Sequence, residues 1–344
     1  MPYSAPSPGD VHVNRPLTNI AIAYMQDQAN LFVADTVFPN VPVAKQSDAY
    51  FTFDRGEWNR DDVKERAPGT ESAGGSFEIG QDTYFARVKG FHMDLNDQLL
   101  ANQDSPLSLD QQATMYVMAK HLLHRELAWA NTYFKAGVWT FQVEGAGAAT
   151  ARANLNPDTT SNGGNNDNLL YWSDDASTPI EDLRWLMTFM HQRTGFRPNK
   201  LVLGRPVFDR LVDHPAIIAR MDRGQTTGAA KANRAIIASL LELDEVVVMD
   251  GIVNAAKQGQ AEANSFIGGK HAMLVYAPAV AGLMLPSAGY TFSWTGFLGA
   301  SNQGVRIKRF YMDPIESTRV EGQQAFVQKL VAKDLAVFIK DIIQ

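Results

Sequence analysis

The sequence contains no cysteine, and this absence excludes several kinds of chemistry. Disulfide bridges, thiolate nucleophiles and cysteine-ligated metal sites are all ruled out, which fits a reducing compartment. Long hydrophobic runs are also missing, since no stretch approaches the ~18 apolar residues that a membrane-spanning helix needs. The first residues, MPYSAPSPGDVHVNRP, lack the basic start and apolar run of a signal peptide. We therefore expect neither a membrane span nor a cleaved leader.

The sequence also lacks an excess of basic residues. The 344 residues include 31 Lys and Arg against 37 Asp and Glu, which gives a formal net charge of −6. A dedicated nucleic-acid binder would present a basic face, so the composition argues against that class. It does not exclude a protein that merely encloses nucleic acid. The hydrophobic share of 45% is ordinary for a globular chain, and the length allows two or three domains.

One long helix dominates what the sequence does contain. The stretch from Pro106 to Ala136 has no Gly or Pro after its first residue and is rich in helix formers. About 30 residues of helix reach roughly 45 Å. Apolar residues recur at helical spacing and predict one buried stripe, made of Tyr116, Ala119, Leu123, Leu127, Ala130 and Phe134. The stripe is widened by Met115, Met118, Leu122, Trp129 and Tyr133. We expect Leu123 and Leu127 to face the core where later strands cross the helix.

The first 44 residues are typical of an arm that gains order from a neighbour. Residues 1–19 are rich in Pro, Ser and Asn, and Ile20 to Leu31 predicts a short amphipathic helix. In the next segment, FVADTVFPNVPV, two prolines force extended backbone. Its apolar residues have too few local partners to be buried by this segment alone. We therefore expect the arm to lie across another subunit.

Residues 45–95 predict a long hairpin. Two strand-like runs, AYFTFDR and TYFARVKGFHMDL, flank a charged, Gly-rich stretch that is almost without aliphatic residues. Such a tip has no core of its own and would be unusual inside a compact domain. Two interpretations are equally open, a solvated flexible loop and a projection that lies on a neighbouring subunit. In the second, interface charges would come from Arg55, Arg60, Asp61, Asp62, Lys64, Glu65, Arg66 and Glu71.

Beyond the long helix, residues 138–178 are turn-rich and predict an irregular surface excursion. Helical stretches then alternate with short apolar strands from 179 to about 286, which indicates a compact α/β domain. From Tyr290 to the end, alternation of apolar and charged residues predicts half-solvated antiparallel strands. The α/β domain is thus inserted into a second domain, and the fold class is α+β.

No stretch offers a convincing catalytic, cofactor or metal site. His121 and His124 share a helix face near Glu126, but no HExxH or other ligand cluster accompanies them. Asp61 and Asp62 have no acid–base partner nearby in sequence. The stretch from Gly224 to Lys231 lacks the Gly-Lys-Ser/Thr ending of a phosphate loop, and Lys308 and Arg309 beside two aromatics predict a basic strand edge. We therefore expect no enzyme activity and no cofactor.

The order of arm, hairpin, long helix, inserted α/β domain and closing strands resembles the major capsid proteins of tailed bacteriophages, with the Hong Kong 97-like fold. WNRDDVKERAPGTES is similar to the tip of that family's extended hairpin, the E-loop, and TGFRPNKLVLGRPVFDRLVDHPAI to the opening of its axial domain. AFVQKLVAKDLAVFIKDII is similar to its terminal strands. The resemblance implies an arm at 1–44, an E-loop at 45–95, a peripheral domain at 96–178 and 287–344, and an axial domain at 179–286.

The resemblance also implies a function. The chain would be a virion shell subunit that forms pentamers and hexamers around double-stranded DNA, without sequence-specific binding. Scaffolding, portal and decoration proteins are its possible partners, with assembly in the host cytoplasm. Some members of the family cross-link through a hairpin lysine; Lys64 is suitably placed, but no residue pattern establishes its partner. An encapsulin-type compartment and, less favoured, a soluble α/β enzyme remain the alternatives.

Overall fold

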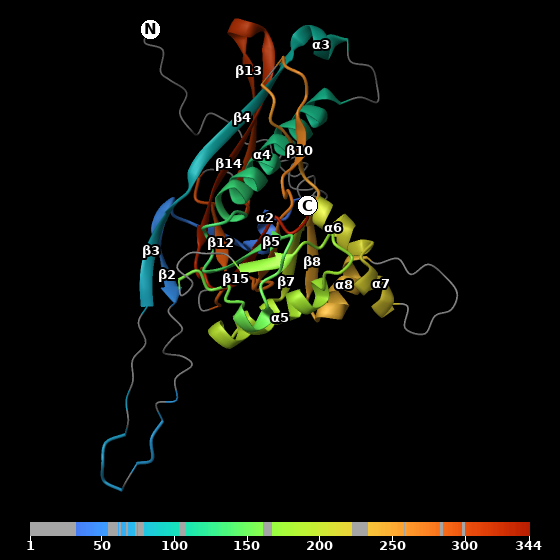
Figure 1. Cartoon of the computed structure of the whole chain (residues 1–344). Coiled ribbons are helices and arrows are strands. Elements are labelled where there is room, and N and C mark those ends of the chain that lie inside the picture. The colour runs from blue at the N-terminus through green and yellow to red at the C-terminus, as the bar shows by residue number, and fades with distance from the viewer. Residues whose placement is uncertain are drawn as a thin grey trace.

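The structure is a computed structural model that describes residues 32–53, 61, 63–66, 68–72, 74, 79–102, 108–160, 167–221, 233–257, 259–282, 285–297 and 300–344. Helices and strands are mixed along these ranges, as Figure 1 shows. Two larger sheets, of five and six strands, organise the body, and a two-stranded hairpin extends beyond them. The predicted mixed α and β architecture is confirmed.

The five-stranded sheet joins strands that lie far apart in the sequence. Its strands are β1 (Asn40–Val43), β4 (Arg87–Asn96), β12 (Gly289–Trp294), β13 (Val305–Met312) and β14 (Ser317–Leu330). The order is β1-β12-β14-β13, and β4 pairs with the opposite edge of β14. Only the β1–β12 pair is parallel within this sheet. This sheet therefore combines two strands from the N-terminal third of the chain with three strands from its C-terminal part.

Helix α4 (Leu109–Tyr133) confirms the predicted long helix, with shorter bounds. The predicted apolar stripe is confirmed in part, since Met118, Leu122, Trp129, Ala130, Tyr133 and Phe134 are buried. Tyr116 is 47% exposed, however, and Leu123 and Leu127 are only partly buried. The buried positions are Ala113, Thr114, Val117, Met118, His121, Leu122, Arg125, Glu126, Trp129, Ala130 and Tyr133. Strand β14 crosses the helix at this face. The close contact is possible because Gly322 of β14 has no side chain and lies directly against Val117 and His121.

The six-stranded sheet has the order β6-β5-β15-β11-β7-β8. Its strands are β5 (Phe141–Ala146), β6 (Asp167–Leu170), β7 (Lys200–Gly204), β8 (Glu245–Met249), β11 (Ala272–Val275) and β15 (Ala336–Lys340). Two predictions were therefore wrong. The stretch after α4 is not only a surface excursion, because β5 and β6 pair in this sheet. The last strand is not half-solvated, because β15 lies between β5 and β11 and is almost wholly buried.

Four helices accompany the six-stranded sheet, as Figure 1 shows: α5 (Pro179–Thr194), α6 (Arg205–Val212), α7 (Pro215–Met221) and α8 (Arg234–Leu241). Helix α5 begins with Pro179 and ends at Gly195, whose φ of 76° suits glycine, as its sequence predicts. Residues 205–221 form two helices rather than one, because Pro215 cannot continue the hydrogen bonding of α6. Most of the large buried cluster of apolar side chains lies between these helices, the sheet and the end of α4.

The hairpin consists of β2 (Ser47–Phe53) and β3 (Ile79–Phe85), which pair antiparallel from Ser47–Phe85 to Phe53–Ile79. Smaller elements are α2 (Ala34–Val37), α3 (Asp97–Ala101), the antiparallel pair β9 (Ile252–Asn254) and β10 (Asn264–Phe266), and single 3-10 turns at Arg152–Asn154 and Asp313–Ile315. Within the residues that the structure describes, none of the helices has the length and apolar character needed to cross a membrane.

Candidate functional site

The hairpin is anchored on the five-stranded sheet by aromatic rings. Tyr84 of β3 stacks on Phe292 of β12 with ring centroids 4.6 Å apart, and Tyr50 of β2 lies 5.2 Å from the same ring. With Tyr290 these side chains form a separate buried cluster. Aromatic pairs at such distances stabilise by about 0.5–1.5 kcal/mol beyond the burial of their area. The base of the hairpin is therefore fixed to the body by apolar packing.

Hydrogen bonds of the Tyr50 hydroxyl also attach the hairpin to the sheet. Its hydroxyl lies 2.8 Å from Oδ2 of Asp82 on the partner strand and 2.9 Å from the carbonyl oxygen of Leu330 at the end of β14. Lys329 reaches the same carboxylate at 3.8 Å. Burial, with the nearby Asp82 carboxylate as the second cause, raises the pKa of Tyr50, so its hydroxyl stays protonated and able to donate. One side chain thus links both hairpin strands to the sheet.

The predicted interface charges lie beyond this base, and the structure describes only some of them. Arg55, Arg60 and Asp62 lie outside the described residues. The others are all exposed, namely Asp61, Lys64, Glu65, Arg66 and Glu71. Figure 1 shows the described part of this stretch far from both sheets, at the lower end of the view. Within the described part of the stretch the hydrogen bonds are local, such as Arg66 Nε donating to the carbonyl oxygen of Thr70.

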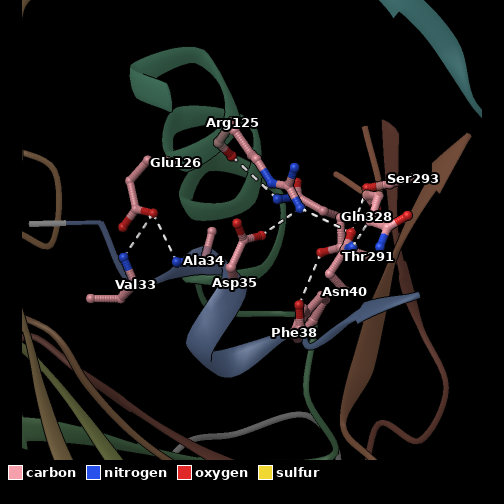
Figure 2. A network of polar contacts seen from close by, with 11 residues as sticks. Val33, Ala34, Asp35, Phe38, Asn40, Arg125, Glu126, Thr291, Ser293 and Gln328 are labelled. Carbon is pink, nitrogen blue, oxygen red and sulfur yellow. Dashed lines mark hydrogen bonds and ion pairs between the residues drawn. The ribbon is translucent and has the colours of Figure 1, made fainter. Parts of the chain in front are cut away.

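A second polar site lies inside the molecule, where α2 meets α4 (Figure 2). Glu126 of α4 is 1% exposed, and its Oε2 accepts hydrogen bonds from the backbone N–H groups of Val33 at 3.1 Å and Ala34 at 2.8 Å. A carboxylate suits this position because the first N–H groups of a helix have no partner within it. Burial is the largest influence on the carboxyl and raises the pKa of Glu126 to about 7.

Arg125, the residue beside it, is equally buried and faces the other end of the same segment. Its Nη2 lies 2.6 Å from Oδ1 of Asp35 in α2 and 3.4 Å from Oδ1 of Asn40 in β1. The guanidinium carbon is 5.0 Å from the ring centre of Phe326. Gln328 of β14 donates to the Arg125 carbonyl oxygen at 3.3 Å. A cation this deeply buried is tolerated only because it is paired.

Two further sheet residues hold the same short stretch of chain, residues 33–40. Lys200 of β7 donates from Nζ to the carbonyl oxygen of Thr36 at 2.8 Å, and Thr291 of β12 donates to that of Phe38 at 3.1 Å. Residues 33–40 are thus bonded to α4 and to both large sheets. We call these residues and their polar partners the junction.

The burial of Glu126 and Arg125 was not predicted from the sequence. Both are charged, and the apolar stripe predicted for the helix passes beside them. Val117, His121 and Arg125 recur at i+4 spacing and mark the buried face. A search for apolar residues alone overlooks this face, because two of the three residues are polar. His121 itself fits the expected packing role, since its Nε2 lies 2.9 Å from the carbonyl oxygen of Gly322 and burial lowers its pKa.

The described residues offer no cluster of three or more His, Asp or Glu side chains that could hold a metal ion. His124 is exposed and stands apart from Glu126, whose carboxylate is engaged by α2. Arg309 pairs with Asp110 at 3.2 Å, so this basic strand residue has a structural partner. The stretch from Gly224 to Lys231 lies outside the described residues.

Comparisons with known proteins address the fold and the identity of the chain. No family model matches. A protein called major capsid protein, from Pseudomonas phage JBD67, is 26% identical over 336 residues, which cover 95% of this chain and 96% of the relative. A phage-related protein from Bordetella bronchiseptica RB50 superposes with a TM-score of 0.69 and 18% identity, over 96% of this chain and 98% of that one.

Two assembled particles share the architecture at lower similarity. The bacteriophage PhiM1 mature capsid matches with a TM-score of 0.51 and 11% identity, over 89% of this chain and 86% of that chain. An encapsulin complex from Synechococcus elongatus matches with a TM-score of 0.50 and 8% identity, over 100% and 94%. The chain has the Hong Kong 97-like fold. The predicted resemblance to phage major capsid proteins, and with it the function of a phage major capsid protein, are confirmed.

Proposed function

We propose that this capsid protein assembles with copies of itself into an icosahedral shell of pentamers and hexamers that encloses double-stranded DNA. The observation that carries the proposal is the hairpin. Its base is fixed by Tyr50 and Tyr84, while the described residues of its tip are exposed, include five charged side chains and lie far from the body. A projection that is anchored at its base and has no core of its own is suited to lie on another subunit. Its charges pair there across the contact.

The division of the chain into functional parts follows from this proposal. Residues 1–44 act as the arm, 45–95 as the E-loop, 96–178 with 287–344 as the peripheral domain, and 179–286 as the axial domain. The six-stranded sheet unites strands from the last two parts, because β5 and β15 pair in one sheet with β7 and β11. The peripheral and axial parts therefore share this sheet.

The proposed role is structural rather than enzymatic. The net charge of −6 supports enclosure of DNA without sequence-specific binding. We expect assembly in the host cytoplasm, and scaffolding, portal and decoration proteins are possible partners. The side chains that carry the role are the hairpin charges Asp61, Lys64, Glu65, Arg66 and Glu71, together with Arg55, Arg60 and Asp62.

Expression of the full-length chain, followed by size analysis and electron microscopy, tests the proposal. Closed particles of uniform size, or capsomers that convert into them, are expected. A small soluble oligomer under all assembly conditions would overturn the proposal. The nucleic-acid content of particles from phage-infected cells separates a DNA-filled capsid from a compartment with protein cargo.

A further inference from the structure

The junction has an unusual distribution of charge. Two carboxylates lie at the start of α2, that of Asp35 in α2 itself and that of Glu126 in α4. Among the described residues, Arg125 is the one cation that faces them. Its Nη2 forms an ion pair with Asp35 at 2.6 Å. The buried Nε and Nη1 of Arg125 have no hydrogen-bond partner. Lys200 reaches α2 at its other end, through the carbonyl oxygen of Thr36.

Glu126 has no ion pair among the described residues, because the nearby cation, Arg125, is paired with Asp35. In the described part of the chain, its hydrogen-bond partners are two neutral N–H groups, both on Oε2. A protonated carboxyl can accept both bonds on its carbonyl oxygen and carries no charge to be desolvated. An ionised carboxyl keeps the bonds but leaves a charge inside the protein, beside that of Asp35.

We propose that Glu126 is a proton-controlled latch on the start of α2, closed when its carboxyl is protonated and weakened when the carboxyl is ionised. The latch acts on residues 33–40, which connect the first 31 residues to both large sheets through Lys200 and Thr291. Ionisation would therefore loosen the attachment of residues 33–40 to α4 and to the two sheets. This inference concerns the single subunit and does not depend on shell assembly.

The direction of the effect follows from the pKa of Glu126. It is about 7 in the closed junction, against 4.5 for a carboxyl in water. The closed state therefore binds more protons between these values, and its stability is highest at low pH and falls as pH rises toward 7. Each pH unit in that window changes the closing equilibrium by up to about tenfold. Above the raised pKa the equilibrium levels off.

Hydrogen exchange of the full-length protein, read by mass spectrometry as protection factors of peptides that contain Val33 and Ala34, tests the latch. Between pH 6 and pH 8 the protection of wild-type protein should fall about tenfold. Glu126→Gln, which is neutral and nearly isosteric, should keep its protection over the same range. Glu144→Gln is the matched control, because it removes a half-buried carboxylate from β5, away from the junction. It should behave as wild type.

Two outcomes would overturn the proposal. One is a wild-type protection that does not change, or that rises, between pH 6 and pH 8. The other is an equal fall in wild type and Glu126→Gln, which would assign the pH dependence to another group. Far-UV circular dichroism of both variants verifies that each is folded. If Glu126→Gln does not fold, the wild-type pH profile compared with Glu144→Gln decides alone.

Discussion

The hairpin and the junction attach the N-terminal part of the chain to the same body by opposite means. The hairpin stands on packed aromatic rings and carries its charges outward, where they are exposed. The junction buries Arg125 and Glu126 at 2% and 1% exposure and bonds both within the subunit. Charges that are bonded inside the subunit serve the fold of one chain. Charges that remain outside are available to other chains.

Removal of a core ring from α4 should have the largest effect on the subunit. Trp129 is 0% exposed, and its ring is 5.7 Å from Phe134 and 6.0 Å from Phe38. Trp129→Ala should lower the free energy of unfolding by about 3–5 kcal/mol. Met115→Ala, at a 40% exposed position of the same helix, should change it by no more than about 0.5 kcal/mol. Denaturation of free subunits in urea measures both, and equal losses would disprove the assigned face of α4.

Loss of the ion pair at the junction should come next. Asp35→Asn keeps the shape of the side chain but leaves the buried guanidinium of Arg125 without its carboxylate. We expect a loss of about 1–3 kcal/mol, the cost of a buried group left poorly satisfied. Asp209→Asn, which breaks an exposed pair with Arg205 on α6, should cost at most about 1 kcal/mol. Thermal unfolding distinguishes them, and a larger effect at Asp209 would contradict the contrast.

The hydroxyl at the hairpin base should matter less. Tyr50→Phe keeps the ring on Phe292 but removes the link to Asp82 and Leu330. The free energy of unfolding should fall by about 0.5–1.5 kcal/mol. Tyr311→Phe, whose hydroxyl bonds Asp97 at 2.6 Å on a 50% exposed side chain, should cost less. A greater loss at Tyr311, measured in urea, would show that the base is not held by this hydroxyl.

Much of the fold follows from local patterns in the sequence. The 25-residue α4, the stop of α5 at Gly195 and the pairing of the hairpin strands all depend on nearby residues. The place of β15 does not, because its parallel neighbour β5 lies about two hundred residues earlier, and short apolar runs do not identify their partners. The junction could not be predicted either. Nothing near Glu126 in the sequence indicates that N–H groups of Val33 and Ala34 will meet it.

The smallest effect on the subunit should come from the hairpin tip. Lys64→Glu reverses an exposed charge and should change the free energy of unfolding by no more than about 0.5 kcal/mol. Assembly should nevertheless suffer, because a weak contact that recurs at every subunit is multiplied across a shell. Light scattering of assembly reactions measures this, with Lys333→Glu, on the turn between β14 and β15, as the control. Failure of Lys64→Glu to fold would place the tip in the core and contradict its exposure.

Cryo-electron microscopy of particles assembled from the full-length chain tests the central claim most directly. We predict a closed shell in which residues 61–74 of each subunit lie against the body of a neighbouring subunit, with their charges paired across that contact. A shell in which these residues project into solvent and touch no neighbour would contradict the account.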